Sequence, residues 1–345
     1  MMTSPTPPRK LLFLVLVLLV LSACSPLPRT PSSSTADPAN QLTTPLPEET
    51  PTPTPLPELV WLVLPAGADP AAFQAVQNWL EQKSAGGGML FETKDPAALN
   101  NAPENLRLAV FAAPDPAAAN WAAAFPQTRV IILDDPSTEP AANLSVVRPA
   151  VIPQAFIAGY IATLVAPDLR SAALFDQNDP QLSLLRDGFQ NGGRYFCGRC
   201  APVFAPVVLF PQTGVLNLND GVESWKAAFD TLHQNRIQIL YLPGSVARDT
   251  QFLDYLAAQN VAVLAAEPPP DGYQDQWVVS IHKDTLSALD TLWQEWQSGA
   301  GGQALLPAFK LDNINPDRLS EGRLRLIQHT MSELQGGWIA PLSVP

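Results

Sequence analysis

Four charged side chains lie at or just beyond the carboxyl ends of expected strands: Asp69, Asp134, Glu267 and Lys283. In open α/β sheets ligands bind outside the carboxyl ends of the strands, so these residues are candidates for one site. Carboxylates accept hydrogen bonds from hydroxyl groups, an ammonium group balances their charge, and Phe73 offers an aromatic face to a flat ring. The set predicts a binding site for a small, polar, hydroxyl-bearing molecule.

These residues also have simpler structural interpretations. Asp69 precedes a helical pattern and suits the position of its amino-terminal cap. Phe73 falls on the apolar face of that helix and suits the core, and Lys283 suits a solvated surface. The sequence leaves both interpretations open.

Motifs typical of enzymes are missing from the sequence. It has no Gly-x-Ser-x-Gly elbow, no Gly-x-x-x-x-Gly-Lys phosphate loop and no His/Glu cluster with metal spacing. Its three histidines, His233, His282 and His329, are scattered and are interpreted as surface or packing residues. We therefore expect that the protein is not an enzyme and that it has no cofactor and no metal site.

Cys197 and Cys200 form a Cys-x-x-Cys pair between an expected helix and an expected strand. A thioredoxin-like pair belongs at the amino terminus of a helix, where the dipole lowers the thiol pKa, and zinc would need two further ligands. We favour a structural disulfide in an oxidising compartment, and a thiol oxidoreductase is the alternative.

Strands alternate with helices along the chain after residue 58. Residues 59–64 are a continuous apolar run, typical of a strand that is covered on both faces. Further strands are expected at 89–91, 106–111, 129–133, 144–147, 170–175, 206–210, 237–242, 261–265 and 277–281, with an edge-like tail at 337–341. Helices are expected after Asp69, around Trp121 and Phe125, and at 182–192, 221–234, 249–259, 285–296 and 320–334. The pattern predicts an α/β fold of two Rossmann-like lobes, with parallel sheets flanked by helices and a cleft between the lobes.

The segment 154–193 is the expected junction of the two lobes and one wall of the site. Phe156, Gly159 and Tyr160 have helical spacing, and small residues around them allow close packing. The strand 170–175 and a second helix follow.

The amino terminus has the layout of a secretory signal peptide. Arg9 and Lys10 precede the apolar run 11–21, which is shorter than the ~20 residues of a membrane span. Leu21-Ser22-Ala23-Cys24 resembles the bacterial lipoprotein box, in which the cysteine becomes the lipidated first residue. We expect a signal peptide at 1–24 and an extracytoplasmic protein anchored to the bacterial cell membrane through Cys24. An ordinary signal peptide or an anchor helix is the alternative.

Residues 25–57 contain ten prolines, with Ser and Thr in many of the other positions. This composition buries too little apolar surface to fold and predicts a semi-extended tether. A docking ligand or a glycosylated stalk is the alternative. The remainder, 58–345, is long enough for two lobes: lobe 1 at about 58–152 with part of 284–345, and lobe 2 at about 168–283.

Composition excludes one class of partner. The net charge is −12 and Lys and Arg are not clustered, which argues against nucleic acid as a partner. The 46% hydrophobic content is that of a globular protein.

Several motifs resemble one known family. Gln154-Ala155-Phe156-Ile157-Ala158-Gly159-Tyr160 and, after the strand, Asp187-Gly188-Phe189-Gln190-Asn191-Gly192 are similar to motifs of the basic membrane protein (BMP) family. Val279-Ser280-Ile281-His282-Lys283-Asp284 resembles its Ser-x-x-Lys segment, and the tail to Pro341 resembles its closing helix and strand. Members of this family are type I periplasmic-binding-protein lipoproteins that capture nucleosides for ABC importers. The resemblance implies that fold, a nucleoside-like ligand and an ABC permease in the membrane as a partner.

The resemblance also implies ligand contacts at particular residues: Asp69, Phe73, Gln74, Asp134, Gly244, Glu267 and Lys283. Glu267 takes the place of the acid that holds ribose hydroxyls, and Gly244 that of a glycine-bearing loop in the second lobe. The chain departs from the family pattern in three places: Gln74 replaces an Asn, Leu218 a stacking Phe, and Phe175 a glycine.

The expected function is therefore a lipid-anchored solute-binding protein that captures a small molecule for an ABC importer. The alternative is a ligand-sensing or degenerate surface lipoprotein of the same fold that takes no part in transport.

Overall fold

The structure, a computed structural model, describes residues 56–342, and these belong to one compact unit of the chain. The predicted signal peptide at 1–24 with Cys24, and all of the predicted tether except Leu56 and Pro57, lie outside the described residues. Within the described part, no helix combines the length and the apolar character that a membrane span requires.

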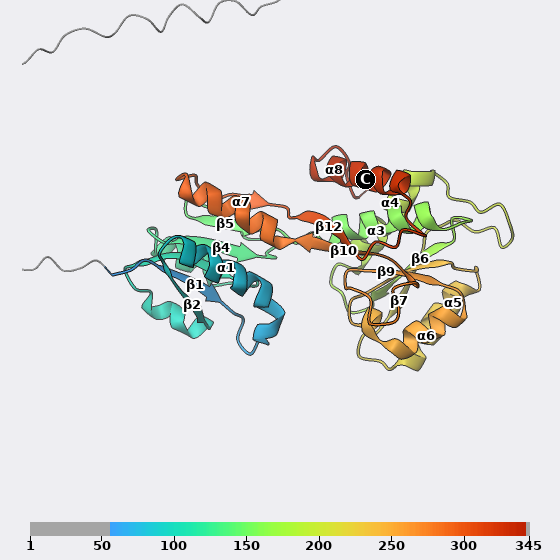
Figure 1. Cartoon of the computed structure of the whole chain (residues 1–345), viewed down its shortest axis with the longest axis horizontal. Coiled ribbons are helices and arrows are strands. Elements are labelled where there is room, and N and C mark those ends of the chain that lie inside the picture. The colour runs from blue at the N-terminus through green and yellow to red at the C-terminus, as the bar shows by residue number, and fades with distance from the viewer. Residues whose placement is uncertain (1–55, 343–345) are drawn as a thin grey trace, which may run out of the picture. The chain divides into compact units, whose positions relative to one another are not determined.

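The first sheet combines the early strands of the described chain with one late strand (Figure 1). Its order is β11 (Ala304–Leu305), β5 (Leu144–Val147), β4 (Arg129–Leu133), β3 (Leu106–Phe111), β1 (Leu59–Val63) and β2 (Leu90–Lys94). All neighbouring strands are parallel. Strand β1 is buried along its whole length, as its continuous apolar run predicts.

Helices cover both faces of this first sheet. On one face, α1 (Gln74–Gly86) and α7 (Thr285–Gln297) share a core cluster with alternate residues of the strands. Trp79 of α1 and Trp293 of α7 meet edge to face there, with ring centroids 5.7 Å apart. On the other face, α2 (Ala118–Ala124) contributes to a second cluster. Short 3-10 helices at Pro70–Phe73 and Pro96–Asn101 precede α1 and β3.

The second sheet is built in the same way. Its order is β12 (Ala308–Asp312), β10 (Trp277–Asp284), β9 (Ala262–Ala265), β8 (Ile239–Leu242), β6 (Ser171–Asp176) and β7 (Gln212–Leu216). Only the pair β10 and β12 is antiparallel. One face carries α3 (Val151–Val165), α4 (Leu182–Cys197) and α8 (Glu321–Gln335), and the other carries α5 (Val222–His233) and α6 (Thr250–Ala258).

The chain passes between the two lobes three times. It crosses from β5 to α3 through residues 148–150, from β10 directly into α7, and from β11 to β12 through Leu306 and Pro307. The Arg148 N–H donates to the Leu305 carbonyl at 2.8 Å, and Asp284 pairs with Ala308, so the crossings lie side by side. Three short adjacent segments of this kind are suited to act as a hinge.

Helices α3 and α4 approach each other backbone to backbone. A Cβ added to Gly159 would lie 1.9 Å from the Phe189 carbonyl oxygen, and one added to Gly192 would lie 1.8 Å from that of Phe156. Only glycine fits at either position, because the atoms in the way belong to the neighbouring main chain. The two helices of the predicted unit 154–193 therefore form one tightly packed layer of the second lobe, its strand is β6 of the sheet, and the first crossing lies just before the unit.

The predicted strand 206–210 is wrong. Proline lacks the N–H that a strand needs at residues 206 and 211, and the Phe210 N–H donates to the Cys200 carbonyl instead of to a neighbouring strand. The strand that pairs with β6 is β7, which begins at Gln212. Gly214 within β7 leaves room for Leu174 and Leu232, whose side chains would lie 3.0 Å from an added Cβ.

Other elements also differ from the prediction. The helix predicted at 182–192 continues to Cys197, and the strand predicted at 89–91 runs from Leu90 to Lys94. The short β11 and the charged β12 were not predicted. The expected edge-like tail at 337–341 is turn and irregular chain, in which the Trp338 N–H donates to the Glu333 carbonyl and so ends α8.

We predict that Gly159→Ala lowers the free energy of unfolding by ~1–3 kcal/mol or more, because the new methyl group forces two helix backbones apart. Gly322→Ala is the matched control. Gly322 lies in α8, and a Cβ added there would meet no atom nearer than Arg325 Nη2 of the same helix, at 4.0 Å, so alanine there should raise stability by up to ~1 kcal/mol. Urea denaturation of both variants measures the difference, and equal effects would contradict the close-packing explanation.

Candidate functional site

A cleft of about 620 Å³ opens where strands of both sheets end. Its lining comes from the loop after β4, the first crossing, the start of α3, the loop after β9 and the end of β10. The lining residues are Asp134, Pro149, Ala150, Val151, Gln154, Ala266, Glu267, Pro268, His282 and Lys283. Three of the sequence-predicted ligand contacts, Asp134, Glu267 and Lys283, are thus brought together.

An ion pair between Lys283 and Asp134 joins the two lobes across this cleft. Asp134 follows β4 of the first sheet, and Lys283 lies in β10 of the second. Their side chains are 37% and 35% exposed, and ion pairs with this exposure contribute only ~0–1 kcal/mol to stability. A ligand hydroxyl group can therefore compete for either partner at little cost to the fold.

Asp134 has a backbone conformation that is unusual for a residue other than glycine. Its φ is +57°, in the left-handed region that Asp and Asn tolerate better than most side chains. Its Oδ1 is buried and has no hydrogen-bond partner among residues 56–342. A strained residue with an unused acceptor at a strand end is typical of a binding site.

Glu267 is held at the opposite side of the cleft, directly after β9. Its side chain pairs with Arg248, and its carbonyl accepts from the Ser280 hydroxyl at 2.8 Å. Gly244 lies beside it, since a Cβ added there would be 3.2 Å from Glu267 Cγ and Oε1. A larger residue at position 244 would push against this carboxylate.

Two polar lining residues, Gln154 and His282, were not among the predicted ligand contacts. Gln154 Nε2 donates to the Ile281 carbonyl at 2.6 Å, and His282 Nε2 lies 3.1 Å from Asp312 Oδ2. The signal for Gln154 was present, because it is the polar residue near the start of an otherwise apolar helix. The signal for His282 was its place next to Lys283.

Asp69, Phe73 and Gln74 lie outside the lining of this cleft. Asp69 caps the 3-10 helix at Pro70–Phe73 by accepting from the Ala71 N–H at 3.0 Å. Phe73 packs against the core under α1, and Gln74 donates to Asn78 at 2.7 Å. These contacts agree with the structural interpretations given for Asp69 and Phe73.

A buried carboxylate next to the site fixes the loop that carries Asp134. Asp135 is 3% exposed and accepts from the N–H and hydroxyl groups of both Ser137 and Thr138. Burial raises the pKa of Asp135, but these hydrogen bonds outweigh it, so the pKa lies below its ordinary value of 3.8. The Asp135 carbonyl also accepts from Arg148 Nη1 at 3.2 Å, which links this loop to the first crossing.

Cys197 and Cys200 form a disulfide with a Cα–Cα separation of 5.1 Å. Cys197 is the last residue of α4, so the pair lies at the carboxyl end of a helix, where the dipole does not favour a thiolate. Among residues 56–342, no group of three or more His, Cys, Asp or Glu side chains could hold a metal ion.

We predict that Asp134→Asn changes the free energy of unfolding by less than ~1 kcal/mol, because the ion pair is exposed and Asn tolerates a positive φ. Asp134→Val should be less stable than Asp134→Asn by ~1–2 kcal/mol, because a β-branched residue is strained in the left-handed region. Urea denaturation at pH 7 measures both. Equal stability of the two variants would show that the strain is absent.

We predict that Asp135→Asn lowers stability by ~1–3 kcal/mol at pH 7, because charged hydrogen bonds are replaced by weaker ones. A carboxylate with a lowered pKa contributes stability above its unfolded-state pKa, and this contribution is lost as the pH falls through the folded-state pKa. The difference between wild type and variant should therefore shrink below about pH 3.8. Unfolding curves from pH 7 to pH 3 test this, and a difference independent of pH would contradict it.

Comparison with known proteins shows similarity in fold. No family model and no curated protein matches the chain. An ABC transporter solute-binding protein from Conexibacter woesei DSM 14684 is 14% identical with a TM-score of 0.60, and the match covers 83% of this chain and 98% of that one. One from Aeropyrum pernix K1 is 13% identical with a TM-score of 0.57, over 82% and 93%. A transcriptional activator of the comK gene from Bacillus halodurans is 10% identical with a TM-score of 0.54, over 82% and 99%.

The similarity to these structures shows the fold alone. The predicted class is confirmed: the chain has two α/β sheets, each of six mostly parallel strands flanked by helices, in a fold like that of type I periplasmic binding proteins.

Proposed function

We propose that the described part of the chain is a solute-binding module that holds a small, hydroxyl-bearing molecule in the cleft between its lobes. The observation that carries this proposal is the composition of the cleft. Both lobes supply charged side chains at strand ends, with Asp134 from one and Glu267, His282 and Lys283 from the other.

Closure of the lobes supplies affinity in this proposal. The three crossings lie side by side and can bend together, while the sheets stay rigid. A ligand that bridges Asp134 and Glu267 would hold the lobes together, with Lys283 released from Asp134 to balance the charge. The weak, exposed ion pairs make this exchange of partners inexpensive.

The resemblance to the BMP family favours a nucleoside-like ligand. The cleft suits the sugar part of such a molecule, because Asp134 and Glu267 are acceptors for vicinal hydroxyl groups. None of the described residues that line it is Phe, Tyr or Trp, so a base would be held by polar contacts instead of by stacking.

We further propose that the module is anchored through a lipidated Cys24 on the outer side of the cell membrane and delivers its ligand to an ABC permease. The lipoprotein box and the Pro-rich segment 25–57 support this proposal. The two similar solute-binding proteins named above are components of ABC transporter systems.

One observation favours a second function, ligand sensing without transport. The charged candidate ligand contacts already have ion-pair partners, since Lys283 pairs with Asp134, and Glu267 pairs with Arg248, which lies outside the cleft lining. A module that has lost high affinity, or that signals through this cross-lobe pair, would have the same arrangement.

A thermal-shift screen of residues 55–345 against nucleosides, bases, sugars and amino acids tests the proposal. A ligand at 100 times its Kd stabilises the native state by ~2.7 kcal/mol, which corresponds to a shift in Tm of a few degrees. We predict a shift with at least one hydroxyl-bearing compound, and nucleosides are the first candidates.

Variants in the cleft test whether a ligand-induced shift in Tm arises from binding there. Glu267→Gln should weaken binding at least tenfold by removing a charged acceptor, which corresponds to ~1.4 kcal/mol. Glu104→Gln, in an exposed turn outside the cleft, is the matched control and should bind normally. If no compound in the panel shifts Tm, the solute-binding proposal is wrong. If other compounds shift Tm and no nucleoside does, the nucleoside assignment alone is wrong.

A further inference from the structure

Exposed apolar side chains gather in one short segment of the second lobe. Of the fourteen large hydrophobic residues that are exposed in the described part of the chain, six lie between positions 195 and 209. They are Tyr195 and Phe196 at the end of α4, and Val203, Phe204, Val207 and Leu209 in the loop that follows. We call residues 201–211 the apolar loop. Val203 is 81% and Phe204 69% exposed, so these side chains stand clear of the protein surface.

The apolar loop has an inner side and an outer side. Pro202 and Phe210 are buried, and Val208 packs against the core under α5 and α6. The inner residues pack against the core of the second lobe, whereas the outer ones, such as Phe204 and Leu209, are exposed to solvent. Their exposure is therefore a property of a fixed loop conformation.

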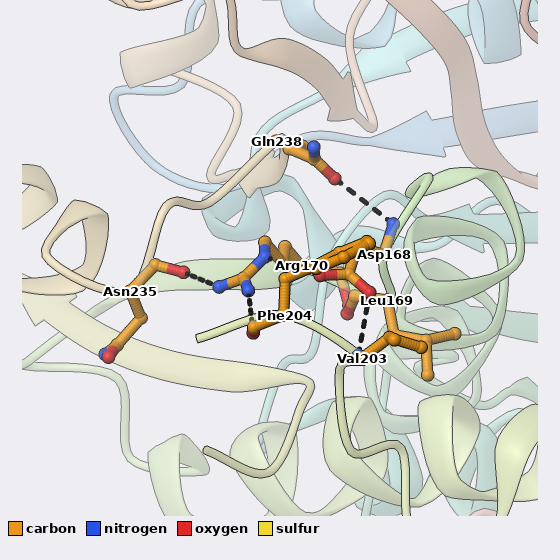
Figure 2. Close-up of polar contacts among 8 residues, drawn as sticks. Asp168, Leu169, Arg170, Val203, Phe204, Asn235 and Gln238 are labelled. Atoms are coloured by element: carbon orange, nitrogen blue, oxygen red, sulfur yellow. Dashed lines mark hydrogen bonds and ion pairs between the residues drawn. The ribbon is translucent and has the colours of Figure 1, made fainter. Parts of the chain in front are cut away.

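A buried arginine holds the loop in this conformation (Figure 2). Arg170 is 3% exposed and pairs with Asp168 at 3.0 Å. Its guanidinium group also donates to the carbonyl of Asn235 at 2.7 Å and to that of Phe204. Asp168 in turn accepts from the Val203 N–H at 3.0 Å, so both ends of the dipeptide 203–204 are fixed.

Two more contacts close the base of the loop. The Cys197–Cys200 disulfide lies immediately before it, and the Phe210 N–H donates to the Cys200 carbonyl at 3.1 Å. The Arg170 guanidinium lies 5.8 Å from the centre of the Phe210 ring. The apolar loop is therefore already ordered in the folded protein, so binding through this loop does not cost the conformational entropy of ordering it.

The stretch of sequence that contains the loop is basic, in contrast to the whole chain, and two carboxylates that contact it are both engaged: Asp168 pairs with Arg170, and Glu333 accepts from the Tyr195 hydroxyl. The net charge is −12, yet residues 188–219 contain no Asp or Glu and include Arg194 and Arg199. Both arginines are exposed, and within residues 56–342 neither has an ion-pair partner. An exposed apolar loop that is preceded by two arginines without ion-pair partners is complementary to an anionic lipid surface.

We propose that the apolar loop is a lipid-binding site that inserts Phe204, Val207 and Leu209 into the interface of an anionic bilayer, with Arg194 and Arg199 at the headgroups. The strong exposure of Val203, Phe204, Val207 and Leu209, together with the two arginines just before the loop, favours an anionic membrane over a protein partner. This site is independent of the cleft. Together with one acyl chain it would supply the second signal that stable membrane attachment requires.

Sedimentation with lipid vesicles tests this proposal on residues 55–345, a compact unit that contains all four core clusters. The vesicles are pure phosphatidylcholine or an equal mixture of phosphatidylcholine and phosphatidylglycerol. We expect binding to the anionic vesicles and a loss of at least about tenfold in the double variant Phe204→Ser/Leu209→Ser. Arg194→Gln/Arg199→Gln should remove the preference for the anionic mixture.

Leu90→Ser is the matched control, because Leu90 is 53% exposed and Leu209 is 60% exposed, and Leu90 lies on the first sheet. It should bind vesicles like wild type, and circular dichroism confirms that every variant is folded. No binding to either vesicle, or equal binding by the Phe204→Ser/Leu209→Ser variant, overturns the proposal. Concentration-dependent dimerisation that this variant abolishes, without vesicle binding, would assign the loop to a second copy of the chain instead.

Discussion

The backbone contact between α3 and α4 is the constraint on which the second lobe depends. Glycines at 159 and 192 let each helix lie against a main-chain carbonyl of the other, so the pair forms a rigid layer on its sheet. Gln154 at the start of α3 is bound to the Ile281 carbonyl of β10 and thereby takes a fixed place in the cleft. The same layer ends at Cys197, where the apolar loop departs. Both the cleft and the loop are therefore positioned by one close contact.

Much of the fold could be predicted because its central strands are continuous apolar runs. Strands β3, β4 and β5 have the predicted bounds, since residues buried on both faces leave no ambiguity of period. Strand β7 was missed because an edge strand with Gly214 at its centre has little apolar signal, whereas 206–210, which forms no strand, has a strong one. Local hydrophobicity cannot distinguish a strand from an extended segment whose N–H groups bond elsewhere.

The grouping of candidate residues was predictable where charged side chains follow strand ends. Asp134, Glu267 and Lys283 could be expected to lie together because ligands of open α/β sheets bind outside the carboxyl ends of the strands, and the structure brings all three into the lining of one cleft. Gln154 and His282 needed the tertiary structure, because they enter the cleft through a helix start and a late strand. The positions of Asp69, Phe73 and Gln74 depend on how the first loop folds, and a 3-10 turn at Pro70–Phe73 directs them to local contacts. Spacing along the chain did not reveal that turn.

The three crossings also determine the order in which the lobes can be completed as the chain is synthesised. The first sheet is made early, but Trp293 of α7 and the strand β11 arrive more than 140 residues after β5 ends at Val147. Until then, one face of the first sheet is covered by α1 alone and lacks the part of its core that α7 supplies. The second lobe is completed by β12, which begins three residues after β11 ends, and by α8 at Glu321–Gln335. Neither lobe is thus an autonomous folding unit with a finished core of its own: the last part of the chain closes both. Synthesis from the amino terminus therefore leaves both lobes incomplete until this last part of the chain is made, and then completes them almost together.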